Sequence, residues 1–194
     1  MAKSLTEILT LFCNKKDRRI ARPFGYERHG IKYAGATDGH VCVLIKSDEI
    51  FEPLSFDLST IFKMYQPGKP VDFAALKKFA GKAKYPQTCR KCEGAGMCSH
   101  CEAECYPCDG AGVIYPDQRP GIIGPMWINR NLLARPLEIV RPVEIVDVTV
   151  GEKYGRTNKD TSPIYIVAPD WQIILMAITP GVTTQGVPVF ELPA

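Results

Sequence analysis

The chain has 194 residues, of which 45% are hydrophobic and 23% are charged, and its formal net charge is +3. This composition is sufficient for one folded core and excludes an intrinsically disordered chain, while so small a net charge does not indicate nucleic-acid binding unless the cations cluster. The apolar N-terminal stretch is broken by Glu7, and no run reaches the roughly 18 uncharged apolar residues of a membrane span, so we expect neither a signal peptide nor a membrane partner.

The first predicted elements are a helix and two strands. Ser4 and Glu7 have the spacing of a capping box, and the apolar residues that follow recur at helical spacing, which predicts a helix over about residues 5–15. Strands are predicted over residues 30–39 and 41–45, around an Asp-Gly turn.

The middle of the chain changes character after residue 51. Helices are predicted over residues 57–65 and 72–84, with a loop rich in proline and glycine between them at residues 66–70. Closely spaced cysteines follow, and residues 116–125 are expected to form a Pro/Gly-rich return linker.

The C-terminal part is expected to contain one helix followed by three strands. The helix is predicted over residues 130–140, with Pro136 either kinking it or lying in its first turn. The strands are predicted over residues 143–150, 164–168 and 172–178.

These elements predict an α+β fold in which an antiparallel sheet and two helices form one discontinuous domain from residues 1–50 and 120–180. Residues 51–119 are expected to be an inserted helical and cysteine-bearing module. Residues 181–194 show little periodicity and are expected to be a disordered tail.

The strongest motif is a cluster of six of the eight cysteines in three C-x-x-C pairs, two of which continue as C-x-x-C-x-G-x-G. Thiolates at this spacing can hold one tetrahedral ion. Each C-x-x-C-x-G-x-G repeat is then a tight loop around the ion, here called a knuckle, and its glycines supply the open backbone that the loop needs. Without a secretion signal, clustered pairs indicate the reducing cytoplasm, where a metal is favoured over disulfides. The predicted cofactor is Zn²⁺, held by the two glycine-bearing knuckles: Cys89, Cys92, Cys105 and Cys108.

Other ligand sets remain open. Cys98 and Cys101 could replace the second knuckle, with His100 on the same connecting loop, and a second ion or an iron–sulfur cluster would also accept these thiolates. A site closed by four thiolates has no position for water, so its role is structural or recognitional. Because the module is too small for a hydrophobic core, the metal would supply on the order of 10 kcal/mol of its folding free energy.

Cations cluster in two places that could meet the phosphates of DNA. The predicted nucleic-acid-binding residues are Lys77, Lys78, Lys82, Lys84, Arg90 and Lys91 near the cysteines, and Lys15 and Arg18 after the first helix. The alternative for the first group is an ordinary solvated helix face.

No catalytic motif is present, neither G-x-S-x-G nor a Walker phosphate loop nor H-E-x-x-H, and we therefore expect that the protein is not an enzyme. His40 could pair with Asp38 as an acid and a base, but the turn favours a structural hydrogen bond at this place.

Five short motifs carry a family resemblance. They are residues 36–40 (Ala-Thr-Asp-Gly-His), 128–133, 143–149, 161–167 and 173–176. In this order they resemble one domain of the bacterial DNA polymerase III beta subunit, the sliding clamp. The chain departs from the family at Val41, where an arginine commonly helps to bind client peptides, and at residues 176–179, which read Met-Ala-Ile-Thr instead of Met-Pro-Met-Arg.

The resemblance implies a DNA-clamp-like domain that serves as a DNA-replication-associated or DNA-binding accessory factor, with DNA or a replication protein as its partner. It implies a homo-oligomer if DNA is encircled, since the chain has room for one such domain, and a small variant of this kind would suit a phage. The residues expected to face DNA are Lys15, Arg18, Arg130 and Arg135. The alternative hypothesis is a zinc-dependent protein–protein interaction adaptor that does not bind DNA.

The glycine-bearing knuckles separately resemble the C-x-x-C-x-G-x-G repeats of J-domain co-chaperones. This chain has two full repeats and lacks the His-Pro-Asp motif of a J-domain. This second resemblance therefore implies metal binding and no chaperone activity.

Overall fold

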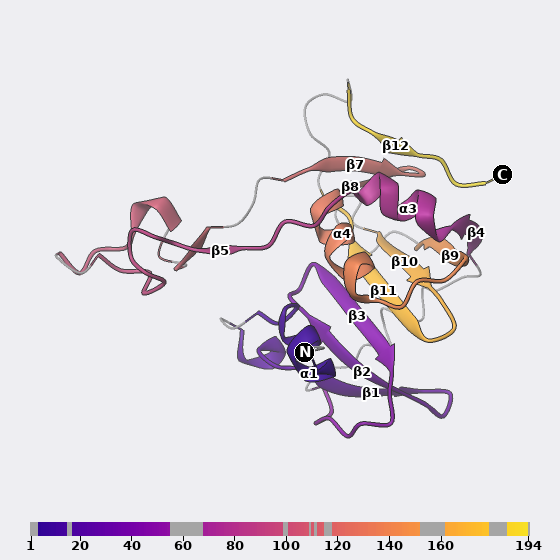
Figure 1. Cartoon of the computed structure of the whole chain (residues 1–194), viewed down its shortest axis with the longest axis horizontal. Coiled ribbons are helices and arrows are strands. Elements are labelled where there is room, and N and C mark those ends of the chain that lie inside the picture. The colour runs from indigo at the N-terminus through magenta and orange to yellow at the C-terminus, as the bar shows by residue number, and fades with distance from the viewer. Residues whose placement is uncertain are drawn as a thin grey trace.

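The structure is a computed structural model that describes residues 4–14, 17–54, 68–98, 101–108, 110, 112–114, 118–151, 162–178 and 186–193 (Figure 1). The predicted helix over residues 57–65 lies outside the described residues, as do Lys15 and His100. Within the described part of the chain, no helix is long and apolar enough to cross a membrane.

A seven-stranded sheet forms the body, in the order β1-β2-β3-β11-β10-β9-β4, and all its neighbouring strands are antiparallel. Its strands are β1 (Phe24–Arg28), β2 (Ile31–Thr37), β3 (Val41–Lys46), β4 (Lys69–Asp72), β9 (Ile145–Val150), β10 (Pro163–Val167) and β11 (Trp171–Met176). The prediction of a mixed α+β fold with a large antiparallel sheet is therefore confirmed.

Among the described residues, three helices pack on one face of this sheet: α1 (Leu5–Thr10), α3 (Phe73–Ala80) and α4 (Arg130–Ile139). Side chains alternate along each strand, as the period of two requires. In β3, Val41 and Val43 join the core under the helices, whereas Cys42 and Leu44 belong to a second apolar cluster with Phe24 and Tyr165. Both faces of the central strands are buried for this reason.

The capping box at the start of α1 is confirmed. The carboxylate of Glu7 accepts a hydrogen bond from the backbone N–H of Ser4. In return, the hydroxyl of Ser4 accepts a hydrogen bond from the backbone N–H of Glu7. The helix, however, ends at Thr10 and not near residue 15. The carbonyl of Leu11 accepts a hydrogen bond of 2.6 Å from the Arg135 guanidinium of α4, and this long-range contact fixes the end of the helix.

The boundary of the insertion needs correction, because the body includes residues 69–80. Strand β4 pairs with β9, and Phe73 and Leu76 of α3 are buried in the main core. Residues 69–70 were expected to be loop because of Pro70, but a proline is tolerated in a strand at the edge of a sheet, and β4 is such a strand.

The described parts of the predicted return linker and tail, residues 118–125 and 186–193, contribute strands to a second sheet of order β12-β7-β8. Its strands are β7 (Pro120–Ile123), β8 (Met126–Asn129) and β12 (Val189–Phe190). The expectation of a disordered tail is wrong for residues 186–193, since β12 pairs in parallel with β7 and the ring of Phe190 packs against that of Phe79, with centroids 5.4 Å apart.

The segment around β5 projects from the body (Figure 1) and contains six of the eight cysteines. This cysteine module, residues 87–114, consists of β5 (Gln87–Thr88), η2 (Tyr106–Cys108) and β6 (Val113–Ile114), with β5 and β6 paired antiparallel. Its buried cluster contains cysteines alone. The module therefore has no apolar core of its own among the described residues.

Candidate metal centre

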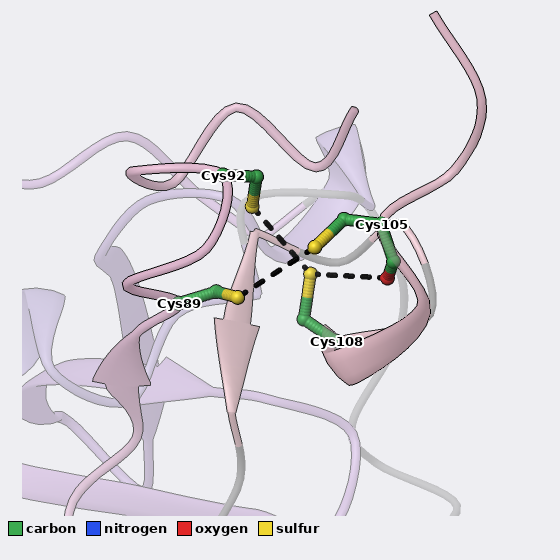
Figure 2. A group of neighbouring side chains, drawn as sticks. All are labelled: Cys89, Cys92, Cys105 and Cys108. Carbon is green, nitrogen blue, oxygen red and sulfur yellow. Dashed lines mark hydrogen bonds between the residues drawn. The ribbon is translucent and has the colours of Figure 1, made fainter. Parts of the chain in front are cut away.

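The structure brings Cys89, Cys92, Cys105 and Cys108 together, with their sulfur atoms within 4.8 Å of one another (Figure 2). All four side chains are buried. The two glycine-bearing knuckles that the sequence favoured thus meet at one point, and their four sulfurs could hold a metal ion.

The sulfur–sulfur distances match a tetrahedral site. The Sγ atoms of Cys89 and Cys105 are 3.8 Å apart, and those of Cys92 and Cys108 are 3.7 Å apart. A regular tetrahedron with metal–sulfur distances of about 2.3 Å, as in zinc thiolate sites, has edges of about 3.8 Å. Disulfides require about 2.0 Å, and none of the eight cysteines forms one.

The contacts between the two knuckles repeat with an offset of 16 residues and in reciprocal pairs, the pattern of an approximate internal two-fold symmetry. The backbone N–H of Cys89 donates to the carbonyl of Gly112, and the N–H of Cys105 donates to that of Gly96, each at 2.9 Å. The pairing of Thr88 with Val113 is repeated by the bridge between Glu104 and Met97. Each knuckle is therefore closed by the other, and neither is complete alone.

Glycine is required where the two knuckles approach each other. Gly96 and Gly112 have φ values of 77° and 73°, in the left-handed region that other residues rarely adopt. A Cβ on Gly96 would clash with the carbonyl oxygen of Gly110, and one on Gly112 would clash with that of Gly94. The second glycine of each C-x-x-C-x-G-x-G repeat thus lets the backbones meet.

The thiols differ in how readily they lose their protons. The backbone N–H of Cys92 lowers the pKa of Cys89 to about 7, whereas burial raises the pKa of Cys105 to about 12 and also raises that of Cys108. Four thiolates so close together repel one another, and a divalent cation would remove that repulsion. The donor set therefore fits a soft or borderline metal such as Zn²⁺.

Cys98 and Cys101 do not join this cluster. They lie in the hairpin between the knuckles, where the N–H of Cys98 donates to the carbonyl of Ala103; Cys98 is half-buried and Cys101 is exposed. The alternative ligand set with Cys98 and Cys101 is not assembled in this structure.

The predicted nucleic-acid-binding cations lie in separate places. They are Lys77 and Lys78 on α3, Lys82 and Lys84 on the segment between α3 and β5, Arg90 and Lys91 in the first knuckle, and Arg18 in η1 (Arg18–Ile20). All except Lys77 are exposed. The first three groups follow one another from the body into the cysteine module, whereas Arg18 lies in the N-terminal part of the chain, before β1.

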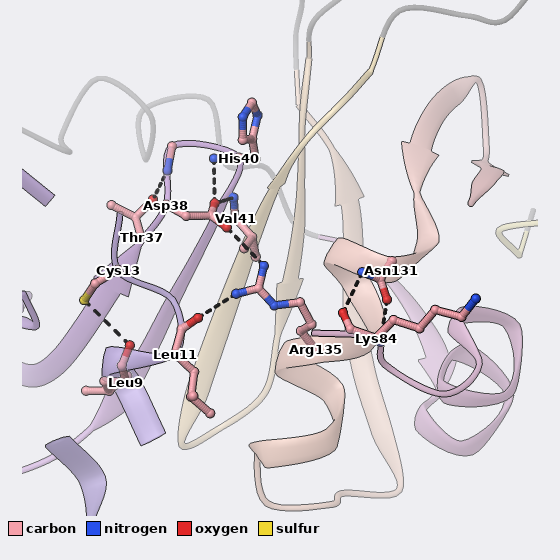
Figure 3. Close-up of polar contacts among 11 residues, drawn as sticks. Leu9, Leu11, Cys13, Thr37, Asp38, His40, Val41, Lys84, Asn131 and Arg135 are labelled. Carbon is pink, nitrogen blue, oxygen red and sulfur yellow. Dashed lines mark hydrogen bonds and ion pairs between the residues drawn. The ribbon is translucent and has the colours of Figure 1, made fainter. Parts of the chain in front are cut away.

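Two arginines expected to face DNA have other roles. Arg135 is buried: its guanidinium forms an ion pair of 3.2 Å with Asp38 and donates to the carbonyl of Leu11 (Figure 3). The same guanidinium lies over the ring of Phe12. Arg130 donates to the carbonyl of Phe79 at 2.9 Å. The prediction for Arg135 is wrong, because a side chain enclosed in this way cannot reach a phosphate.

Asp38 organises the turn between β2 and β3. Its Oδ1 accepts hydrogen bonds from the backbone N–H groups of His40 and Val41, and its Oδ2 faces Arg135. The structural role predicted for this turn is confirmed, although the partner of Asp38 is the backbone of His40 and not its imidazole.

The residues that hold the segment leading into the cysteine module, residues 82–84, against the body could not be found from the sequence. Arg119 donates to the carbonyl of Lys82, and the side-chain amide of Asn131 both accepts from the N–H of Lys84 and donates to its carbonyl. Glu138 accepts from the N–H of Ala83. Each pair is separated by at least 37 residues, so no local pattern marks it.

No protein-family model and no curated protein matches the chain. Two solved structures are similar in shape. The DNA polymerase III subunit beta from Borrelia burgdorferi, in complex with a natural product, has a TM-score of 0.48 and 9% identity, covering 91% of this chain and 61% of that one. The beta subunit from Thermotoga maritima has a TM-score of 0.45 and 9% identity, covering 91% and 62%.

The chain thus spans about three fifths of the length of these two structures. Likenesses at 9% identity and with TM-scores below 0.5 establish neither membership of that family nor a function. What the geometry establishes is an α+β body that carries a four-cysteine cluster able to hold a metal ion.

Proposed function

We propose that this chain is a non-enzymatic, zinc-binding accessory protein that binds DNA through the cations that extend from α3 to the first knuckle. The observation that carries the zinc assignment is the closed cluster of four buried thiolates at tetrahedral spacing. Such a site leaves no open position for a reacting water, which favours a structural role over catalysis.

The cations of α3 and of the neck, defined as residues 81–86 between α3 and β5, support the DNA-binding part of the proposal. Lys78, Lys82 and Lys84 are exposed, and none of them takes part in an ion pair with any other described residue. Because Arg119 and Asn131 hold the backbone at residues 82 and 84, these cations are displayed on a fixed segment. Contacts of this kind with phosphates give affinity without sequence specificity.

A role beside a replication protein, with a clamp-like body, rests on the sequence motifs at residues 36–40 and 161–167. Residues 36–37 end β2 and residues 163–167 form β10 of the antiparallel sheet, an arrangement that is compatible with this role. If several copies encircle DNA, native mass spectrometry at low salt should show a closed homo-oligomer, and a monomer would exclude the ring under those conditions.

Reversing the charge of two lysines tests DNA binding. In the variant Lys78→Glu/Lys82→Glu, we expect the affinity for a duplex oligonucleotide to fall at least about tenfold at about 50 mM salt, because two phosphate contacts become repulsive. The slope of log affinity against log salt should decrease by about two. Fluorescence anisotropy with a labelled duplex measures both quantities.

The matched control is Lys32→Glu/Lys46→Glu, which makes the same change in net charge at exposed positions on β2 and β3. The control variant should retain most of the affinity. Equal losses in both variants would mean that DNA responds to net charge alone, and the proposed surface would be rejected.

A protein–protein interaction adaptor is the second candidate function. It is favoured by three apolar side chains that are exposed on the cysteine module, namely Met97, Tyr106 and Ile114. If the wild-type chain has no measurable DNA affinity at about 50 mM salt, DNA binding is excluded and the adaptor remains.

A further inference from the structure

The two symmetric knuckles differ most at the dipeptides between their cysteines. The first knuckle has Arg90 and Lys91 at these positions, and the second has Tyr106 and Pro107. The hydrogen bonds and the glycines of the two knuckles are repeated, so the metal-binding framework does not require this difference. The difference therefore concerns what each knuckle presents to a ligand.

Tyr106 is 88% exposed. Its side chain has no ring contact, ion pair or hydrogen bond with another described residue, whereas the other described tyrosines each have a partner. A tyrosine offers a large flat surface, and exposing almost all of it forgoes the burial that such a ring normally gains. The ring is thus available to a ligand.

The backbone under this ring is held in place. Tyr106 begins the 3-10 turn η2, in which the N–H of Cys108 donates to the carbonyl of Cys105 at 3.1 Å. The N–H of Cys105 is itself bonded to the first knuckle at Gly96. A metal bound to Cys105 and Cys108 would fix both ends of the turn, so the ring would be displayed at small entropic cost.

The paired cysteines limit how far the cations of the first knuckle can lie from this ring. The sulfurs of Cys89 and Cys105 are 3.8 Å apart, and Arg90 and Tyr106 each directly follow one of these cysteines. Standard covalent geometry then limits the distance between the Cα atoms of Arg90 and Tyr106 to about 17 Å. One short extended ligand can therefore contact both knuckles.

We propose that the cysteine module binds single-stranded DNA, with a base stacked on Tyr106 and neighbouring phosphates contacted by Arg90 and Lys91. The inference rests on the proposed DNA-binding function and deepens it, since it assigns single-stranded DNA to the module and leaves duplex DNA to the lysines of α3 and the neck.

The chemistry of the surface favours this ligand. An aromatic face beside cations is complementary to a chain in which flat bases alternate with anionic phosphates, and a base can stack on a protein ring only when it is unpaired. An acidic peptide would satisfy the cations but would leave the ring without a specific partner. The carboxylates of Glu93 and Glu104 offset part of the positive charge, so binding is expected to be weak and is measured at about 50 mM salt.

The test compares the zinc-loaded full chain with its Tyr106→Ala variant by fluorescence anisotropy, using labelled oligo-dT of 20 nucleotides and a 20-base-pair duplex. We expect Tyr106→Ala to weaken binding of oligo-dT on the order of tenfold and to leave duplex binding unchanged. Tyr106→Trp should retain binding of oligo-dT, because the larger ring stacks as well. Met97→Ala is the matched control, since Met97 is another exposed apolar residue of the module.

The outcomes separate this inference from the proposed function. If Tyr106→Ala leaves oligo-dT binding unchanged while Lys78→Glu/Lys82→Glu weakens duplex binding, the inference is overturned and the proposed function stands. If an acidic peptide displaces oligo-dT as well as unlabelled oligo-dT does, charge alone explains the binding and the inference is overturned. If the wild-type chain binds neither DNA, both are overturned.

Discussion

The variant Cys105→Ser is expected to lose stoichiometric metal binding and to unfold the cysteine module while the body remains folded. The module has no apolar core among the described residues, so the metal would supply most of its folding free energy, on the order of 10 kcal/mol. Removing Cys105 would also leave three thiolates, an incomplete set for a structural zinc site. Native mass spectrometry measures bound zinc, and limited proteolysis reports the state of residues 87–114.

The body should not share this loss, since its sheet and helices have their own buried core. The matched control is Cys98→Ser/Cys101→Ser, which removes two thiols of the same module that lie outside the cluster. This control should retain one zinc ion per chain and its resistance to proteolysis. Loss of zinc from the control but not from Cys105→Ser would reverse the assignment of the ligands.

Replacing Arg135 with methionine is expected to lower the free energy of unfolding by about 3 kcal/mol. The substitution leaves the carboxylate of Asp38 and the carbonyl of Leu11 without their cationic partner, and breaking a partly or fully buried ion pair in this way is strongly destabilising. The contact joins α4 to α1 and to the turn between β2 and β3, so the loss affects the whole body. Urea unfolding followed by tryptophan fluorescence measures it.

Arg141 provides the comparison for this prediction. Its ion pair with Asp170 has a distance of 3.9 Å and its side chain is 82% exposed. Exposed pairs contribute little, so Arg141→Met should change the free energy of unfolding by less than about 1 kcal/mol. Similar effects in the two variants would show that Arg135 does not act as a buried connection.

The elements that could be predicted from the sequence are those with a strong local pattern. The capping box at Ser4, the apolar run of β3 beside an Asp-Gly turn and the apolar face of α3 were each sufficient to place an element. Strand β4 was missed because Pro70 suggests a loop, and β12 because a two-residue strand has no period of its own. Both strands exist through pairing with distant partners, which a local pattern does not contain.

The candidate metal centre was predictable to a greater extent than the surfaces around it. The spacing of Cys89, Cys92, Cys105 and Cys108, together with the glycines, was enough to favour the four sulfurs that the structure brings together. The wrong expectation for Arg135 has a physical reason: a cation on a predicted helix is assumed to face solvent, and only the fold reveals a carboxylate 97 residues away.

The symmetry of the knuckles bears on the ancestry of the module. Since the N–H of Cys89 is bonded to the second repeat and the N–H of Cys105 to the first, half of the module could not have folded alone around a metal. Two separate copies of one short repeat could have done so, as a pair of identical peptides sharing one ion. The present module has the form expected if such a pair had been fused into one chain, after which one dipeptide became Arg-Lys and the other Tyr-Pro.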